Sequence, residues 1–356
     1  MTFWKIFNKM ETNSRRKFVK TTVIAGIGLG IASGSQDTFG TPVTGAGKKI
    51  GLIGLDTSHC VAFTKSLNSP EAGTEFSGYR VVAAYPYGSR DIVSSAERIP
   101  GYTEEVKKLG VEIVSSIEEL IAASDVVMLE TNDGRLHLEQ ALPVIKAGKR
   151  MFIDKPMTAS LVDAMQIFEA SRKYGVPLFS CSSLRDITGM DEILSGKVGK
   201  VLGAETYSPA KLEKTHPDLF WYGIHGVETL FTLMGTGCQS VVRVSNDDCD
   251  LVVGIWTDNR IGTFRGIRKG KADYGGTVFG EKAIQELGGY GGYNPLLKQI
   301  INFFETGIVP VKEEETIEIL AFMEAADLSK ANNSMPVGVQ AVIKNAVSRL
   351  QVKMVE

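Results

Sequence analysis

The segment KIGLIGLDTSH, residues 49–59, combines a short apolar run with a glycine turn and the start of a helix. Residues 50–53 form the run, and its length is typical of a strand buried in a sheet. Gly54 opens the turn, and helical spacing of apolar residues follows over 57–67. A strand, a turn and a helix in this order predict the first unit of a parallel sheet whose strands are joined by helices.

The same alternation recurs as far as residue 183. A helical segment with an apolar face, residues 161–174, stops at Gly175, a residue suited to a helix C-terminus. We therefore predict a Rossmann-type, doubly wound parallel sheet over residues 49–183. Its further strands are expected at residues 81–85, 111–114, 125–130, 151–153 and 177–180.

After about residue 185 the segments become longer and richer in strand-forming residues. This change predicts a second, α+β domain over residues 184–356, with a mostly antiparallel open sheet. A helix beginning near Pro295 and an acidic helix over 313–331 are expected to close this domain. The expected strands are residues 200–208, 240–244, 250–256 and 260–268.

The N-terminal residues have the composition of an export signal. Ser14 to Lys20 read SRRKFVK, and the soft apolar run 21–34 is shorter than the roughly 20 residues that a membrane span needs. We interpret residues 1–34 as a twin-arginine signal and 35–48 as a linker. The signal predicts that the mature protein is exported to the periplasm. The twin-arginine route carries proteins that are already folded, often with a cofactor inside.

Charge and composition exclude several classes of partner and site. Removing residues 1–34 takes away six of 39 basic and one of 41 acidic residues and leaves a net charge of −7, which argues against nucleic acid. Hydrophobic residues make up 43%, without a further apolar stretch long enough to span a membrane. No histidines or cysteines have the local spacing of metal ligands, so we predict no metal site.

The turn GLDTSH, residues 54–59, occupies the place of the G-x-G-x-x-G phosphate-binding turn, but only Gly54 is present. Asp56 would put a carboxylate where an anion docks. Alternatively, Asp56 caps the helix by accepting bonds from the amides of Ser58 or His59. In that case the hydroxyls of Thr57 and Ser58 hold the phosphate.

The second strand lacks the acid that binds a ribose 2′-hydroxyl in NAD-dependent enzymes. Ser89 and Arg90 stand there instead and are candidates for binding a 2′-phosphate. Arg90 is equally compatible with a solvated surface charge. The choice between NAD and NADP therefore stays open.

Two further segments resemble a known family. TNDGRLHLEQ, residues 131–140, and IDKPM, residues 153–157, resemble the Thr-Pro-Asn-x-x-His and Glu-Lys-Pro segments of the glucose-fructose oxidoreductase and inositol dehydrogenase (Gfo/Idh/MocA) family, and the likeness extends over residues 48–340. The resemblance implies a nicotinamide cofactor and puts Lys155 beside the nicotinamide and the reacting hydroxyl. It also assigns cofactor contacts to Thr131, Asn132, His137, Asp154 and Pro156.

The segment FWYGIHGVE, residues 220–228, resembles a segment of the family in which an Asp is followed, after three intervening residues, by the catalytic His. His225 is at the position of the histidine, and Trp221 replaces the aspartate. A histidine suits proton transfer because its unperturbed pKa lies near working pH. Tyr222 and Asp218 are candidates for the missing partner. Four aromatic side chains are candidates for stacking on a sugar or for the core: Trp221, Tyr222, Tyr290 and Tyr293.

The resemblance and the signal together imply an exported, nicotinamide-dependent oxidoreductase that acts on a hydroxyl of a sugar, glycoside or cyclitol. Free cofactor is scarce outside the cytoplasm, so we expect it to be tightly bound and recycled. Two alternatives use the same fold: a glycoside lyase or hydrolase without net redox change, and a catalytically degenerate sugar-binding protein. The family's habit of pairing through the open sheet implies a homodimer or homotetramer.

Overall fold

The computed structural model describes residues 48–72 and 74–353. Its first sheet has six parallel strands in the order β3-β2-β1-β4-β5-β6. The strands β4, β5 and β6 are buried at every position, which explains their continuous apolar runs. The predicted doubly wound sheet is confirmed. Its strands are β1 (Lys49–Ile53), β2 (Arg80–Tyr85), β3 (Glu112–Ile113), β4 (Val126–Leu129), β5 (Met151–Asp154) and β6 (Leu178–Cys181).

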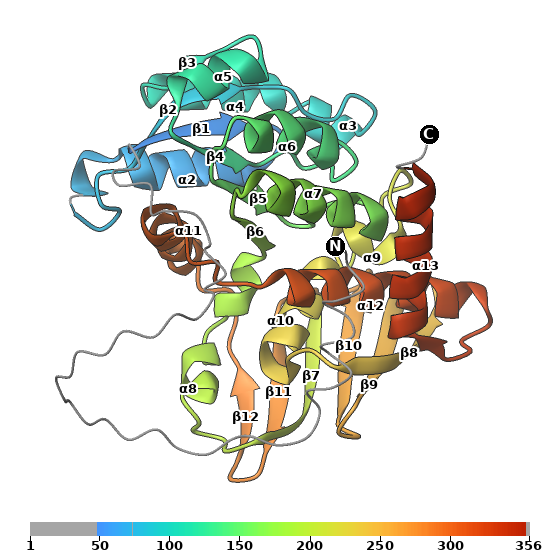
Figure 1. Cartoon of the computed structure of the whole chain (residues 1–356). Helices are drawn as coiled ribbons and strands as arrows, with labels where there is room; N and C mark the ends of the chain where they lie inside the picture. Colours follow the sequence, from blue (N-terminus) through green and yellow to red (C-terminus); the bar gives the residue numbers. More distant parts are fainter. Residues whose placement is uncertain (1–47, 73, 354–356) are drawn as a thin grey trace, which may run out of the picture. The chain divides into compact units, whose positions relative to one another are not determined.

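Helices connect these strands and pack around the sheet (Figure 1). In α7 (Leu161–Tyr174), the Ser160 hydroxyl accepts a bond from the Asp163 amide, and Gly175 ends the helix with a φ of 66°. The helical segment expected there is confirmed. The other helices of this part are α2 (Ser58–Asn68), the 3₁₀ turn η1 (Pro70–Ala72), α3 (Val93–Ala96), α4 (Ile99–Lys108), α5 (Ile117–Ala123) and α6 (His137–Lys146).

The second sheet has seven strands in the order β12-β11-β7-β10-β9-β8-β13. Only β7 and β10 pair in parallel, so the mostly antiparallel sheet is confirmed. The chain enters this sheet through η2 (Ser183–Asp186) and α8 (Met190–Leu194). The strands are β7 (Val201–Pro209), β8 (Cys238–Ser245), β9 (Cys249–Trp256), β10 (Ile261–Ile267), β11 (Gly275–Gly280), β12 (Ile284–Leu287) and β13 (Val337–Gly338).

After α8, the described residues form five further helices: α9 (Asp218–Trp221), α10 (Ile224–Met234), α11 (Asn294–Thr306), α12 (Glu313–Ala331) and α13 (Val339–Lys353). The acidic helix was expected over the residues that α12 occupies. The helix near Pro295 does not close the second domain, and that expectation was wrong. The α11 residues Leu297 and Phe303 are instead fully buried in one core with Leu52 and Phe63 of the first sheet and α2. Figure 1 shows α11 beside α2.

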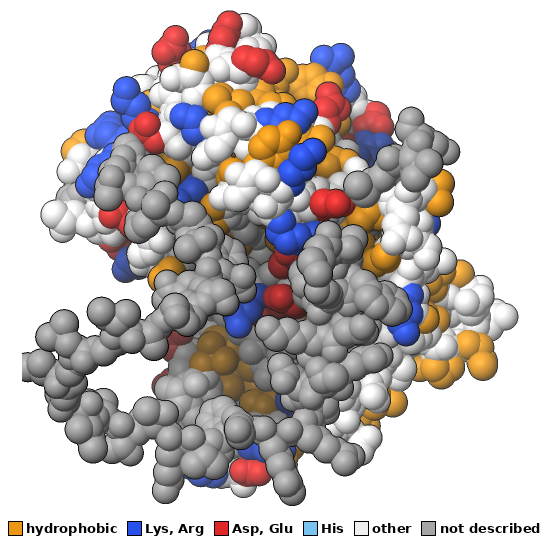
Figure 2. Space-filling model, in the orientation of Figure 1, with side chains coloured by type: hydrophobic (Ala, Val, Ile, Leu, Met, Phe, Trp, Pro, Cys, Tyr) orange, Lys and Arg blue, Asp and Glu red, His pale blue; other side chains and the backbone are white. Residues whose placement is uncertain are grey.

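The expected signal, residues 1–34, and all but the last residue of the expected linker lie outside the described residues. Within 48–72 and 74–353, every helix is too short or too polar to cross a membrane. Basic and acidic side chains are interspersed over the first-sheet helices on the face shown in Figure 2. All four cysteines are unpaired.

Candidate active site

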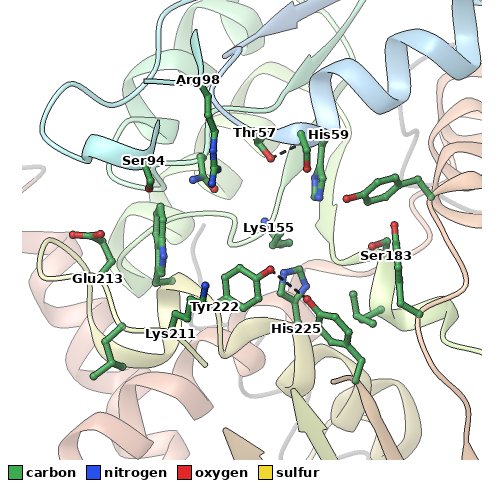
Figure 3. Close-up of a pocket in the computed structure, with 18 of the residues that line it drawn as sticks. Thr57, His59, Ser94, Arg98, Lys155, Ser183, Lys211, Glu213, Tyr222 and His225 are labelled. Carbon is green, nitrogen blue, oxygen red and sulfur yellow. Dashed lines mark hydrogen bonds between the residues drawn. The ribbon is translucent and has the colours of Figure 1, made fainter. Parts of the chain in front are cut away.

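A cavity of about 520 Å³ opens at the carboxyl ends of the first-sheet strands, a size typical of small-molecule sites (Figure 3). The order of the sheet reverses between β1 and β4, and open α/β sheets bind ligands at this point. The helices α9 and α10 contribute the opposite wall. The helices and loops around the first sheet contribute eight lining residues: Thr57, Ser58, His59, Ser94, Arg98, Tyr102, Asn132 and Lys155.

The three predicted catalytic residues line this one cavity. Lys155 follows β5 and is 7% exposed, while Tyr222 and His225 come from the α9–α10 region. Figure 3 shows Lys155 between His59 of α2 on one side and the pair Tyr222 and His225 on the other. The fold therefore brings together groups that are 70 residues apart in the sequence.

His225 has a hydrogen-bond partner that the sequence did not reveal. Its Nδ1 lies 2.7 Å from the Ser182 hydroxyl oxygen, which also accepts a bond from the Leu184 amide. When Nδ1 carries the ring proton, Nε2 is free to accept a proton. Burial, and then the positive charge of Lys155, holds the pKa of His225 well below its ordinary value, so the ring is neutral near pH 7.

The partners proposed for His225 from the sequence have other contacts. Asp218 accepts bonds from Arg243 at 2.8 Å and Lys330 at 2.6 Å, so it is not the partner of His225. Tyr222 meets the His225 ring edge-on at a centroid distance of 5.1 Å and lies 3.3 Å from the Tyr274 hydroxyl. Tyr222 is thus a ring contact of His225 and its hydroxyl points to another tyrosine.

Gly54 and Asp56 shape the turn after β1. Gly54 has a φ of 90°, and a Cβ there would lie 2.4 Å from the Thr131 amide, so only glycine fits. Thr57, not Asp56, caps α2 by accepting from the His59 amide, and the capping role expected for Asp56 was wrong. The Asp56 oxygens accept bonds from the amides of Ser89 and Asn132 at 3.1 and 2.9 Å. Asp56 therefore joins the ends of β2 and β4, and burial raises its pKa.

The two residues expected near a ribose 2′ position do not line the cavity. Ser89 is buried and donates to Asp91 at 2.9 Å. Arg90 is exposed and lies over the Tyr87 ring, 4.8 Å from its centroid. Arg98, next to the start of α4, lines the cavity instead. Arg98 lies in the short connection between α3 and α4, and this position left no sequence signal.

The resemblance-based cofactor contacts divide into two groups. Asn132 and Lys155 line the cavity. Thr131 is buried and donates to Gln140, and the two His137 nitrogens lie 2.6 and 2.9 Å from the carbonyl oxygens of Thr131 and Met157. Asp154 and Pro156 are buried behind the wall. Thr131 and His137 thus hold the loops that follow β4 and β5, which carry Asn132 and Lys155.

Aromatic rings form much of the remaining wall. Trp221, Tyr222, Tyr290 and Tyr293 all line the cavity, and Tyr274 joins them. Such rings offer flat apolar faces together with polar tips, a combination that suits the faces and hydroxyls of a sugar.

His59, Glu130 and Asp154 form a buried cluster beside Lys155. The His59 Nδ1 lies 2.8 Å from an Asp154 oxygen and 3.9 Å from a Glu130 oxygen, and the Lys155 Nζ lies 3.6 Å from Asp154. Burial, and then the charge of Asp154, raises the pKa of Glu130 well above its ordinary value. Burial alone would raise the pKa of Asp154, but His59 and Lys155 hold it low.

Comparison with known proteins agrees with this arrangement. Residues 60–181 match the model of an oxidoreductase family with an NAD-binding Rossmann fold, GFO_IDH_MocA. This part of the chain is therefore similar to the Gfo/Idh/MocA oxidoreductases.

Two relatives illustrate the match. The chain is 34% identical to 1,5-anhydro-D-fructose reductase of Ensifer adhaerens over 119 residues, which are 32% of this chain and 35% of the relative. It is 38% identical to inositol 2-dehydrogenase of Cereibacter sphaeroides over 76 residues, which are 21% of this chain and 22% of the relative. The chain thus spans between about a fifth and a third of the lengths of these two curated relatives.

Solved structures extend the likeness in fold. A probable dehydrogenase from Thermotoga maritima superposes with a TM-score of 0.67 at 20% identity, over 83% of this chain and 99% of that one. Scyllo-inositol dehydrogenase from Lactobacillus casei, solved with NAD(H) and scyllo-inositol, gives a TM-score of 0.66 at 14% identity, over 82% and 99%. The likeness in fold therefore extends beyond residues 60–181 into the part of the chain that forms the second sheet.

The cavity residues of this chain fit a dinucleotide. Thr57 and Ser58 line the cavity at the N-terminus of α2, where free amides favour an anion, and Arg98 points toward the same region (Figure 3). The Asp56 carboxylate does not line the cavity and accepts bonds from two amides. Lys155 lines the same cavity, between His59 and His225 (Figure 3).

Proposed function

We propose that this protein is an NAD- or NADP-dependent oxidoreductase that acts on a hydroxyl of a sugar, glycoside or cyclitol. The observation that carries the proposal is that Lys155, Tyr222 and His225 line the same cavity as the N-terminus of α2. A hydroxyl-binding group, a proton acceptor and a phosphate-binding helix end are the parts that such a reaction requires.

The cofactor would be held by Thr57, Ser58 and Arg98 at its phosphates and by Asn132 and Lys155 toward its reacting end. When bound, the nicotinamide supplies the acceptor for the hydride that leaves the substrate carbon. Every other task falls to the protein, and the residues that perform it line the cavity or support its wall.

Lys155 donates a hydrogen bond to the reacting oxygen and holds it in place. The Nε2 of His225 accepts the proton of the hydroxyl as the carbonyl forms, and Ser182 stabilises the resulting imidazolium by accepting from Nδ1. Because the pKa of His225 is low, the ring is already neutral and ready to accept that proton near pH 7.

The aromatic wall supports a carbohydrate-like substrate. Tyr290 and Tyr293 lie 5.4 Å apart by ring centroids, and Tyr222 contacts His225 directly. A sugar or cyclitol ring stacked there would present its hydroxyls to Lys155 and His225, since all these residues line one cavity.

The twin-arginine motif supports export with the cofactor already inside. We therefore extend the proposal to a periplasmic protein whose cofactor is retained and recycled between two half-reactions. Replacing Arg15 and Arg16 by Lys should keep the chain in the cytoplasm, as measured by cell fractionation. Equal periplasmic yield of the variant would contradict this route.

A single-turnover experiment tests the activity. The isolated protein is mixed with a panel of sugars, glycosides and cyclitols while the fluorescence of reduced nicotinamide is followed. We expect a signal with at least one compound, and a loss of about 100-fold or more in its rate in Lys155→Met and His225→Asn. His216→Gln, which changes a buried histidine outside the cavity, should retain the signal. Cleavage of a glycoside without any nicotinamide signal would favour the lyase or hydrolase alternative.

A further inference from the structure

Three side chains that can ligate a metal converge from separate elements beneath the cavity. His59 lies in the first turn of α2, Glu130 directly follows β4, and Asp154 ends β5. One ligand atom from each lies within 4.8 Å of the other two. Local sequence spacing could not reveal this cluster because the three residues are separated by 71 and 24 positions.

The atoms that face one another lack partners outside the cluster and Lys155. His59 Nδ1, both Glu130 oxygens and both Asp154 oxygens are buried, and within the described residues their side-chain contacts are the ionic ones given above. Glu130 is 0% and Asp154 1% exposed. Buried acidic groups are normally paired or bind a metal, because an uncompensated charge in an apolar interior is strongly unfavourable. Lys155, 3.6 Å from Asp154, supplies one positive charge for two carboxyl groups.

We propose that His59, Glu130 and Asp154 bind one divalent first-row metal ion, such as Mn²⁺ or Zn²⁺, at the floor of the cavity. One imidazole nitrogen and two carboxylates are ligands that these ions accept. Two ligands of one such ion lie about 3 to 4 Å apart, so small side-chain rotations from the observed 2.8 and 3.9 Å contacts suffice.

The proposed metal site borders the cavity. His59 and Lys155 line the cavity, whereas Glu130 and Asp154 lie behind them. An ion with three protein ligands keeps at least one position for water or for an oxygen of a bound molecule. The inference is independent of the proposed redox function, because its three ligands have no part in the proton transfer at His225.

Two alternatives to a bound ion lead to different expectations. Glu130 can remain protonated as a structural acid, in which case the cluster needs no ion. The free oxygens can also accept bonds from hydroxyl or amide groups of the nicotinamide cofactor, in which case replacing Glu130 would weaken nucleotide binding and not metal binding.

The test uses the full-length protein as isolated from cells, after dialysis against a chelator. Titration with Mn²⁺, followed by the loss of the free-ion electron paramagnetic resonance signal, should show one saturable site. Glu130→Gln and Asp154→Asn should weaken that site by at least about 100-fold, the upper range seen when groups supporting metal ligands are removed. His216→Gln is the matched control, because His216 is also buried with its Nε2 3.3 Å from a carboxylate, that of Asp133. The control should bind Mn²⁺ as the unchanged protein does.

Measurements on the unchanged protein keep the proposal testable even if the variants fail to fold. X-ray absorption of the Mn²⁺-loaded protein should show one imidazole among oxygen ligands. Absence of saturable Mn²⁺ or Zn²⁺ binding, or a site without imidazole, would overturn the proposal, as would Mn²⁺ binding unchanged in folded Glu130→Gln. Bound nucleotide is measured on the same sample, so loss of the metal site and loss of the redox function are separate outcomes.

Discussion

At the level of single residues, Ser182 takes the place of the acid expected beside the catalytic histidine. Its hydroxyl lies 2.7 Å from His225 Nδ1 and is held by the Leu184 amide. We predict that Ser182→Ala lowers kcat about 10-fold, the equivalent of one hydrogen bond of about 1.4 kcal/mol. The acid limb of the pH profile, already below pH 6.5, should move to still lower pH because the imidazolium loses its acceptor.

Steady-state kinetics across pH distinguish this positioning role from a packing role. Ser180→Ala, which changes another buried serine in the same region, should leave both kcat and the acid limb unchanged. A Ser182→Ala enzyme with a lower kcat but an unmoved acid limb would mean that Ser182 acts only through packing.

Asp56 shows how much of the residue-scale chemistry depends on tertiary structure. Its place in the turn was evident from the sequence, but one interpretation placed its carboxylate where an anion docks and the other gave it the local amides of Ser58 or His59. The actual partners are the amides of Ser89 and Asn132, which lie in the loops that follow β2 and β4. For the same reason, a cluster such as His59, Glu130 and Asp154 is visible only after the sheet has formed.

At the level of elements, Asp56 joins the end of β2 to the end of β4. We predict that Asp56→Ala lowers the free energy of unfolding by about 2 to 4 kcal/mol, since one buried amide and one half-buried amide lose their acceptor. Urea denaturation measures this. Asp125→Ala, which removes a carboxylate that accepts from the exposed Lys49 amide, should cost less than about 1 kcal/mol. Equal losses in the two variants would contradict the role given to Asp56.

Glu318 connects α12 to the start of β8 by accepting bonds from the amides of Gly237 and Cys238, both at 2.7 Å. Burial raises the pKa of Glu318 from 4.5 to about 7. Between these values the folded protein holds a proton that the unfolded chain has lost. This contribution to stability is therefore complete below pH 4.5 and is lost as pH rises through about 7.

Glu318→Gln cannot titrate and should remove this part of the pH dependence. We compare the unfolding free energies of the unchanged protein and the variant at pH 4.5 and at about pH 8. Relative to the variant, the unchanged protein should lose at most about 3 kcal/mol of stability between these two pH values. Urea denaturation at both pH values provides the comparison. A difference that is constant with pH would show that the carboxyl is not the titrating group.

Elements with strong apolar periodicity were predictable, and elements defined by their neighbours were not. The first-sheet strands appear as apolar runs because both sheet faces are covered. β11 contains three glycines in six residues, and β12 is exposed at alternate positions, so neither has a strand signal of its own. The sequence identified α11 as a helix. The apolar face of this helix does not reveal whether it packs in the core of the first sheet or in that of the second.

At the level of the whole molecule, the second sheet leaves apolar side chains in solvent. Leu202, Ile255, Ile261 and Ile284 are 47%, 40%, 54% and 68% exposed on β7, β9, β10 and β12. An exposed apolar sheet surface favours association with another chain. We propose that a second copy covers it, which gives a homodimer or homotetramer.

Light scattering after size-exclusion chromatography tests this assembly. We predict that Ile261→Glu combined with Ile284→Glu reduces the mass to that of one chain, because charges would be buried in the contact. Val93→Glu changes a residue that is 67% exposed on α3 and should leave the mass unchanged. If the unchanged protein is already a monomer, the sheet face is not an interface between copies.

The nicotinamide cofactor is the central claim for the molecule as a whole, since the altered turn at Asp56 and the exchange of an acid for Trp221 both depart from the family pattern. The most direct test is to isolate the exported protein, denature it and identify the released nucleotides by mass spectrometry. We predict close to one NAD or NADP per chain. Absence of any nicotinamide nucleotide, together with no binding of added NAD or NADP to the folded protein, would contradict the proposed function.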